Sequence, residues 1–344
     1  MKKHQEIKNL IARIKHLDQI DIELLFSAIL TPQELEIMEK RCQLIKELLK
    51  NTPHREISQK LKISISQITR GSKELKYGIG GKIFPKIFKP TKLEEIIENK
   101  IQEIKKLPEI SDNFNIAELP KIKSFKNFIS QKFSIIAEIK TKSPSEGFIT
   151  ENKIQEIADE YIDAKIDAMS VLTDKKFFNG SFNEMLKISK KTTIPILCKD
   201  FIIDKKQIYN ARIYGAAAVL LIVKVIKNQK KLSELVEFAK SLSLDCLVEI
   251  SNQEELEVAL NSSTEIIGIN SRNLDTFEVD IEIFKNLFQK IPSNITKVAL
   301  SGINTPADIS ELKNICNAVL IGTHFCKMPI QNIANEVQNF KNAI

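Results

Sequence analysis

Side chains that can transfer protons stand at the ends of short apolar runs in the second part of the sequence. Glu138 and Lys140 end the first run, and they point the same way because side chains alternate along a strand. Lys199 follows the third run, Glu249 lies in the fifth, and Asn270 follows the sixth. Amines and carboxylates gathered in this way act as general acids and bases. One alone is more often a solvated charge or a structural ion pair, but five in matching positions indicate an active site.

The elements that must position these residues are eight short apolar runs, which alternate with helical segments after residue 90. Each run is apolar throughout, as expected for strands buried on both faces. Eight such units in about 250 residues favour a closed (β/α)8 TIM barrel, which carries its chemistry at the carboxyl ends of the strands. A doubly wound open sheet is the alternative. The predicted strands are Ser134–Glu138, Ala168–Leu172, Ile194–Cys198, Ala217–Val223, Cys246–Ile250, Ile266–Ile269, Lys297–Leu300 and Ala318–Ile321.

Small residues follow the last two predicted strands. Ser301 and Gly302 come after the seventh strand, and Gly322 and Thr323 come after the eighth. In TIM barrels these two loops commonly bind phosphate through backbone N–H groups. Two tight turns would explain the glycines equally well. The pattern therefore suggests a phosphorylated small molecule as substrate. No cluster of His, Cys and carboxylate residues has the spacing of a metal site, so none is predicted.

The first 77 residues have apolar spacings of three and four, which predict helices over 2–17, 21–29, 32–50, 55–61 and 65–76. Thr31, Pro32 and Glu34 form a helix-start signal with a capping box. Three glycines then occur among residues 78–81, before a basic stretch. We therefore predict a helical domain over 1–77, a basic linker over 78–90 and the barrel domain over 91–344.

Charge is unevenly distributed between these parts. Residues 1–90 carry 18 basic and 10 acidic side chains, a net charge of +8, while the rest of the chain carries a net charge of −1. A basic module suggests a polyanionic partner. A general richness in lysine is the plainer explanation. Residues 55–76 also fit two short helices joined by the turn 62–64, as in a helix-turn-helix, with an ordinary helical corner as the alternative.

Composition excludes other classes of protein. Hydrophobic residues make up 43% of the chain and charged residues 28%, which is ordinary for a globular protein. No apolar run is long enough for a membrane span, and the N-terminus lacks the apolar core of a secretory signal. The five cysteines form no CxxC pair, which favours free thiols. We therefore expect a cytoplasmic protein that does not contact a membrane.

The segments SIIAEIKTKSPSEG, SVLTDKKFFNGSF, IPILCKDFIID, CLVEI, IIGINSRNL and LIGTHF are similar, in this order, to indole-3-glycerol phosphate synthase. The similarity covers about residues 91–340. It implies that 1-(o-carboxyphenylamino)-1-deoxyribulose 5-phosphate is converted to indole-3-glycerol phosphate with loss of CO2 and water. The resemblance implies that no cofactor is needed.

The same resemblance implies roles for individual residues. Lys199 corresponds to the acid that protonates the ketone, and Lys140 to the lysine near the substrate carboxylate that is implicated in dehydration. Glu138 and Glu249 correspond to carboxylates that stabilise the cationic intermediate and move protons, and Asn270 to a positioning amide. The residues that match substrate and phosphate contacts are Ser143, Phe178, Arg272, Ser301, Gly302, Gly322 and Thr323. One departure is Leu300, where the family usually has glutamate.

Residues 10–77 resemble the Trp repressor family through LTPQE, KRCQLIKELL, REI and ITRGS. The resemblance implies an intertwined homodimer that binds operator DNA in response to L-tryptophan. Arg41 and Arg70 would sandwich the indole, and Thr31 would lie near the head group of the ligand. The residues matched to DNA contacts are Ser58, Ile65, Ser66 and Thr69. Glu74 departs from the family, which usually has a small residue there.

Three hypotheses follow from the sequence. The first is a tryptophan-responsive DNA-binding module fused to an active synthase. The second is a synthase whose helical module only dimerises it. The third is a regulator whose barrel is catalytically impaired, which the Leu300 departure suggests.

Overall fold

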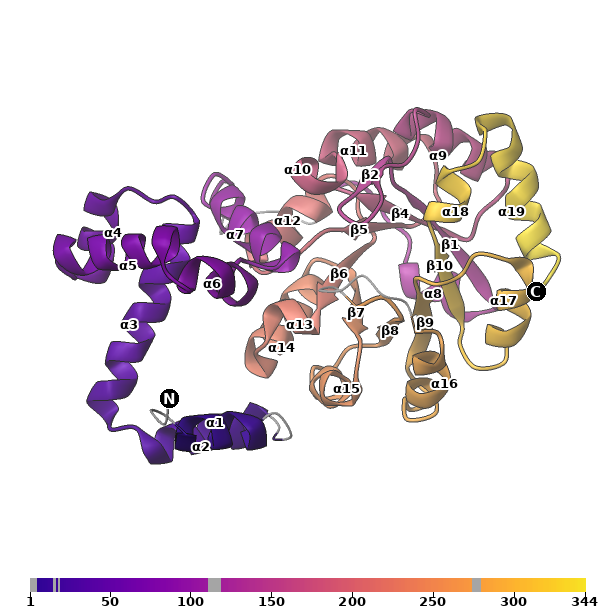
Figure 1. Cartoon of the computed structure of the whole chain (residues 1–344). Helices are drawn as coiled ribbons and strands as arrows, with labels where there is room; N and C mark the ends of the chain where they lie inside the picture. The colour runs from indigo at the N-terminus through magenta and orange to yellow at the C-terminus, as the bar shows by residue number, and fades with distance from the viewer. Residues whose placement is uncertain (1–4, 15–16, 18, 111–118, 274–279) are drawn as a thin grey trace. The chain divides into compact units, whose positions relative to one another are not determined.

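The chain folds into two compact units, Met1–Pro90 and Thr91–Ile344, which are described separately (Figure 1). The structure is a computed structural model that describes residues 5–14, 17, 19–110, 119–273 and 280–344. Within these ranges, no helix is both long and apolar enough to cross a membrane.

The first unit consists of helices, as the apolar spacing predicts. Thr31 caps the long third helix, and its hydroxyl oxygen accepts a hydrogen bond from the Glu34 N–H in the predicted capping box. A small core of Leu44, Ile57 and Ile68 joins three of the helices. The helices are α1 (Gln5–Ile14), α2 (Gln19–Ile29), α3 (Pro32–Leu49), α4 (His54–Leu61), α5 (Ile65–Tyr77) and α6 (Gly80–Phe88).

The helix-turn-helix prediction is confirmed by α4 and α5. Lys62 ends α4 in the left-handed conformation, with φ of 52°, which glycine adopts more easily. Ser64 then starts α5 with a second capping box, in which Gln67 is the reciprocal partner. The turn is therefore built by a strained lysine and a strong helix start.

The prediction of a linker over 78–90 is wrong, because most of this segment is helix α6. Gly78 and Gly80 led to the linker prediction because glycine often interrupts helices. A Cβ on Gly78 would lie 2.2 Å from the Glu74 carboxylate, and one on Gly80 would lie 2.4 Å from the Phe84 ring. These glycines permit close packing of α6 against α5.

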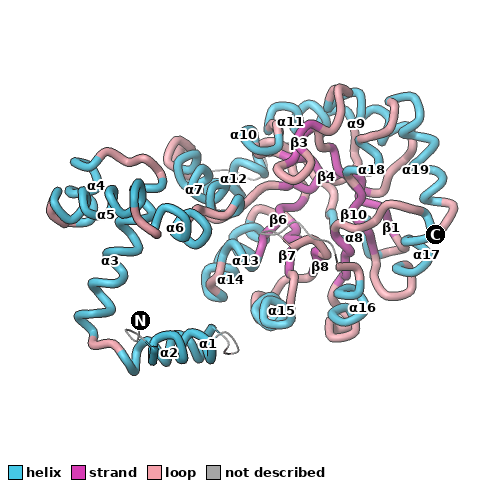
Figure 2. The backbone as a smooth tube through the Cα atoms, in the orientation of Figure 1, coloured by secondary structure: helices cyan, strands magenta, loops and turns pink. Residues whose placement is uncertain are grey.

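The second unit is a closed barrel of eight parallel strands in the order β1-β10-β9-β8-β7-β6-β5-β4, with β4 paired to β1 (Figure 2). Closure excludes the doubly wound alternative. The strands lie within two residues of the predicted bounds: β1 (Ser134–Ile139), β4 (Ala168–Leu172), β5 (Ile196–Lys199), β6 (Ala218–Ile222), β7 (Asp245–Ile250), β8 (Ile266–Asn270), β9 (Thr296–Leu300) and β10 (Ala318–Ile321).

Helices surround the barrel. Alternate residues of each strand face two apolar clusters, so that Ile136 joins the inner cluster while Ile135 and Ala137 join the outer one. The helices and the short hairpin are α7 (Lys92–Ile104), α8 (Phe125–Ser130), β2 (Lys142–Ser143), β3 (Gly147–Phe148), α9 (Ile154–Asp163), α10 (Lys175–Phe178), α11 (Phe182–Lys191), α12 (Lys205–Ile213), α13 (Val223–Ile226), α14 (Gln229–Ser241), α15 (Gln253–Leu260), α16 (Glu282–Phe288), α17 (Pro306–Leu312), α18 (Thr323–Cys326) and α19 (Ile333–Lys341).

The core of the first unit leads to a stability prediction. Ile68 is fully buried, whereas Ile65, one turn earlier in the same helix, is 46% exposed. Ile68→Ala should lower the free energy of unfolding of this unit by about 2–5 kcal/mol, and Ile65→Ala by much less. Denaturant unfolding followed by circular dichroism measures both changes. Equal effects of the two substitutions would contradict the assigned core.

Candidate active site

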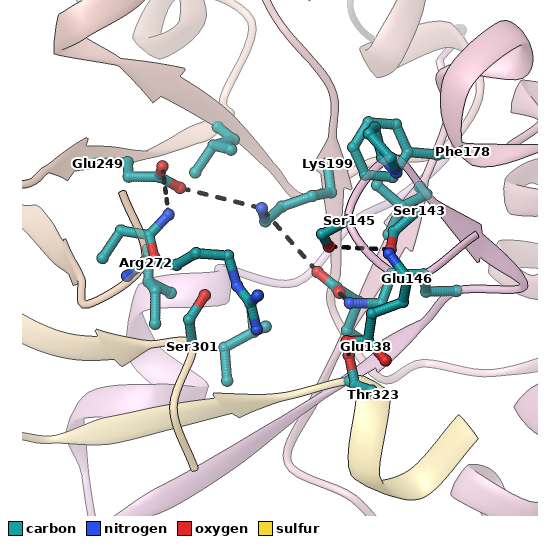
Figure 3. A pocket seen from close by; sticks show the side chains of 18 of the residues that line it. Glu138, Ser143, Ser145, Glu146, Phe178, Lys199, Glu249, Arg272, Ser301 and Thr323 are labelled. Carbon is teal, nitrogen blue, oxygen red and sulfur yellow. Dashed lines mark hydrogen bonds and ion pairs between the residues drawn. The ribbon is translucent and has the colours of Figure 1, made fainter. Parts of the chain in front are cut away.

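One pocket lies at the carboxyl ends of the barrel strands (Figure 3). Its lining includes all twelve residues that the sequence singled out in the barrel: Glu138, Lys140, Ser143, Phe178, Lys199, Glu249, Asn270, Arg272, Ser301, Gly302, Gly322 and Thr323. The pocket gathers these residues because parallel strands present their carboxyl ends on one side.

The Lys199 ammonium lies between two carboxylates at the centre of the pocket. Its Nζ is 4.0 Å from Glu138 Oε2 and 3.9 Å from Glu249 Oε2, and Figure 3 draws both contacts. Lys140 Nζ lies 3.1 Å from Glu138 Oε1. Both glutamate side chains are buried, while the two lysines keep partial access to solvent. Two cations and two anions thus balance each other in a largely buried site.

The ionisation of Glu138 depends on the two lysines. Burial of the carboxyl group raises its pKa, but the positive charges of Lys140 and Lys199 outweigh burial, so that the pKa of Glu138 lies below its usual value. Glu138 is therefore an anion at neutral pH.

Glu249 is oriented by a neighbouring amide. Asn270 Nδ2 donates a hydrogen bond to Glu249 Oε1 at 2.9 Å, and Asn270 Oδ1 accepts one from the Arg272 N–H at 2.9 Å. The other oxygen, Glu249 Oε2, is buried and has no hydrogen-bond partner among the described residues. Buried oxygens of this kind usually have a partner. Glu249 thus presents an acceptor to whatever occupies the pocket.

The loops after β9 and β10 form one wall of the pocket. Ser301 and Gly302 both have positive φ values, 67° and 77°, which turn the chain sharply at the end of β9. Gly322 lies close to Glu138, because a Cβ at this position would lie 2.6 Å from Glu138 Oε1. The absent side chain leaves room for the Glu138 carboxylate. Thr323 Oγ1 donates a hydrogen bond to Glu146 Oε1 at 3.3 Å.

Phe178 and Ser143 also line the pocket. Phe178 ends α10, and its ring centroid lies 6.0 Å from that of Phe201. Ser143 ends β2, and its hydroxyl oxygen accepts a hydrogen bond from the Glu146 N–H at 3.1 Å. An aromatic face at one side and small polar residues at the other suit a ligand with a ring and a polar end.

Leu300 stands at the end of β9 and also lines the pocket. Its side chain is 2% exposed and fills the space beside Gly268, where a Cβ would lie 2.7 Å from Leu300 Cδ1. The leucine is thus packed into the wall. The Glu138 and Glu249 carboxylates still line the pocket beside it.

Some pocket residues were not identified from the sequence. Leu93 and Ile96 line the pocket from α7, and Asp200 and Phe201 line it just after β5. The sequence did contain a signal for Leu93 and Ile96, because the spacing of residues 93, 96, 97 and 100 indicates one face of a helix. That spacing does not reveal what the face contacts.

In the first unit, a shallow hollow on α5 is lined by Ile65, Ser66, Thr69, Arg70, Lys73, Glu74, Tyr77 and Gly78. Three of the residues matched to DNA contacts lie here, next to Arg70. Ser58 lies apart on α4, where its hydroxyl donates to the Ile63 carbonyl at 2.7 Å. Thr31 and Arg41 lie at the start and middle of α3 and do not line the hollow. This hollow therefore contains one of the three predicted corepressor residues, Arg70.

A closed parallel barrel with acid–base groups at its strand ends defines the second unit as a TIM-barrel enzyme. Residues 93–340 match the family model for indole-3-glycerol phosphate synthase, and residues 5–82 match that for Trp repressor protein. The chain belongs to the indole-3-glycerol phosphate synthase family.

Relatives named indole-3-glycerol phosphate synthase support this assignment. The protein of Caldanaerobacter subterraneus is 44% identical over 241 residues, which cover 69% of this chain and 93% of the relative. A protein of Thermoanaerobacter is 42% identical, with 72% and 98% covered. The protein of Aliarcobacter butzleri is 42% identical, with 73% and 91% covered. The resemblance stated from the sequence is thus confirmed for both parts of the chain.

The charge balance of the pocket predicts a pH effect. Lys140→Met removes a cation beside buried Glu138, so the pKa of that carboxyl should rise. If ionised Glu138 is needed for turnover, the acid limb of the residual kcat/KM should move to higher pH. A pH–rate profile measures the shift, with exposed Lys142→Met as the control that leaves it in place. An unmoved acid limb in Lys140→Met would contradict this account of Glu138.

Proposed function

We propose that the barrel pocket closes an indole ring, with Lys199 as the general acid. The substrate is 1-(o-carboxyphenylamino)-1-deoxyribulose 5-phosphate. Its aromatic carbon that bears the carboxylate attacks the ketone carbon, and a carbon–carbon bond forms as the ketone oxygen receives a proton. Loss of CO2 and then of water restores the aromatic ring and gives indole-3-glycerol phosphate.

The position of Lys199 is the observation that carries this proposal. Its ammonium reaches into the pocket from the end of β5, held between the Glu138 and Glu249 carboxylates without a tight ion pair to either. An ammonium at 3.9–4.0 Å from its counter-ions keeps its protons available for a ketone oxygen.

The other residues take complementary roles. Lys140 binds the carboxylate that leaves as CO2 and assists dehydration, while Glu138 and Glu249 stabilise the cationic intermediate. Glu249 Oε2, the oxygen that has no hydrogen-bond partner among the described residues, accepts a proton. Asn270 holds Glu249 Oε1 in place. Phe178 packs on the anthranilate ring. The phosphate and ribulose chain bind along Ser143, Arg272, Ser301, Gly302, Gly322 and Thr323.

Lys199→Ala should lower the rate of ring closure by about 10²–10⁴-fold with the fold intact, because a positioned acid contributes that much. Indole-3-glycerol phosphate formation, followed by its absorbance, measures the loss. Lys187→Ala, which removes an exposed lysine of α11, is the matched control. Turnover like that of the unaltered protein in Lys199→Ala would remove this residue from the mechanism.

We further propose that the first unit is a DNA-binding module that answers to L-tryptophan. Support comes from the match to the Trp repressor family and from the net charge of residues 1–90. The exposed face of α5 offers Ile65, Ser66 and Thr69 to the edges of bases, while the lysines around it would contact phosphates.

A second copy of the chain would complete this module. Thr31 and Arg41 are about 15 Å apart along α3, at 1.5 Å per residue, so one tryptophan bound to Arg41 and Arg70 does not reach Thr31 of the same chain. Thr31 of the partner subunit can supply that contact in an intertwined dimer. Apolar side chains of α1–α3 support such an assembly, because many are half exposed: Ile7, Ile11, Leu24, Ile29 and Ile37.

Glu74 decides how a ligand fits beside Arg70. Its carboxylate already accepts a hydrogen bond from the Gly80 N–H at 3.0 Å, at the start of α6. A tryptophan head group would have to bind next to an anion that is held in place.

The competing function of the first unit is a helical module that only dimerises the enzyme.

Arg70→Ala should weaken L-tryptophan binding and so reduce the tryptophan dependence of operator binding, because loss of a stacked cation costs about 0.5–2 kcal/mol and loss of its hydrogen bond to the ligand adds to this. Gel shifts on operator DNA with and without L-tryptophan at fixed salt measure this. Lys76→Ala, an exposed lysine of the same helix outside the hollow, should weaken DNA binding but keep the tryptophan dependence. The synthase activity of both variants should be unchanged.

The outcome for the unaltered protein separates the two functions of the module. Operator binding that tryptophan does not change, or binding without any preference for sequence, would contradict a tryptophan-responsive repressor. A dimer that does not bind DNA would support the competing function.

A further inference from the structure

Helix α7 covers part of the active-site pocket and holds one buried cation. Leu93 and Ile96 line the pocket from this helix, and Lys100 lies one to two turns further along the same face. Lys100 is 2% exposed, which is exceptional for lysine. A buried ammonium of this kind needs carboxylate partners.

Lys100 bridges two buried carboxylates that come from different loops of the barrel. Its Nζ lies 2.7 Å from Asp200 Oδ1 and 2.8 Å from Asp174 Oδ2. Half-exposed Glu103 is a third partner at 2.9 Å. In the described part of the chain, no other cation forms an ion pair with Asp174 or Asp200. A single ammonium thus compensates both buried charges.

Each of these aspartates fixes the backbone beside a residue of the pocket. Asp200 follows Lys199 directly, and its carboxylate accepts hydrogen bonds from the Phe201 N–H at 2.7 Å and from Thr173 Oγ1 at 2.8 Å. Asp174 caps α10, where its carboxylate accepts from the N–H groups of Phe177 and Phe178. The Lys100 cluster therefore ties the carboxyl end of β5, which carries Lys199, to α10, which carries Phe178.

We propose that Lys100 is a positioning residue for ring closure, which holds Lys199, Phe178 and the pocket-lining face of α7 in register through Asp200 and Asp174. The role rests on the functions proposed above for Lys199 and Phe178. Lys100 itself does not line the pocket, so it acts only through its partners. The cluster also explains why α7, which lies outside the eight βα units, is part of the enzyme.

The first test compares Lys100→Met with Lys105→Met, which changes an exposed lysine at the end of the same helix. Lys100→Met should lower kcat/KM at least tenfold, with most of the loss in kcat, at a temperature where circular dichroism shows a folded protein. Lys105→Met should match the unaltered enzyme. A folded Lys100→Met protein with unaltered kcat would overturn the proposal.

A second variant separates positioning from stability. Removal of Lys100 leaves two buried carboxylates without a counter-ion, which destabilises a protein whatever the function of the cluster. Lys100→Met combined with Asp174→Asn and Asp200→Asn removes these charges and should regain much of the lost Tm, while kcat stays low because the bridge is still missing. Recovery of Tm and kcat together would show a purely structural role and overturn the proposal.

A spectroscopic readout reports the position of α10 directly. The chain contains no tryptophan, so Phe178→Trp introduces a single tryptophan at the pocket wall, which can be excited selectively over the four tyrosines. Adding Lys100→Met should shift its emission to longer wavelength and increase its quenching by acrylamide, whereas adding Lys105→Met should change neither. An unchanged spectrum in the Lys100→Met background would overturn the proposal. If Lys199→Ala retained turnover, the proposed acid would be wrong, yet this spectrum would still test what Lys100 positions.

Discussion

The charge balance at the barrel mouth is the constraint on which the rest of the site depends. Three ion pairs, at 3.1–4.0 Å, link two lysines and two glutamates in a largely buried space. Buried charges are tolerated only when they are paired. Each must therefore come from a rigid element, and the carboxyl ends of three strands, β1, β5 and β7, provide this. Gly322 illustrates the tightness, because any side chain there would displace Glu138.

The same requirement extends outward from the pocket. Asn270 fixes one oxygen of Glu249 and leaves the other for a ligand. Beside Lys199, the chain is fixed through Asp200 and in turn through Lys100 of α7. The charged groups of the pocket are thus supported by a surrounding layer of hydrogen bonds and ion pairs, of the kind that precise positioning of side chains requires.

The sequence predicted the strands and the polar residues at their ends, because runs such as Ala218–Ile222 are apolar on both faces and short. The capping box at Thr31 followed from local spacing alone. The segment 78–90 was predicted wrongly because Gly78 and Gly80 serve packing rather than chain flexibility, a distinction that needs the position of Glu74 and Phe84. Lys100 was missed for a similar reason: its partners, Asp174 and Asp200, are distant in sequence, and periodicity does not report pairings of that kind.

Both units relate to tryptophan metabolism. The second belongs to a synthase family of tryptophan biosynthesis, and the first matches the Trp repressor family. We propose that the ring end of the ligand packs on Phe178 and that its phosphate lies at Ser301, Gly302, Gly322 and Thr323. A crystal structure of the full chain with indole-3-glycerol phosphate bound tests this most directly. We expect the indole beside Phe178, the phosphate at the loops after β9 and β10, and the Lys199 ammonium between them. A product bound in the reverse orientation, or outside this pocket, would contradict the account.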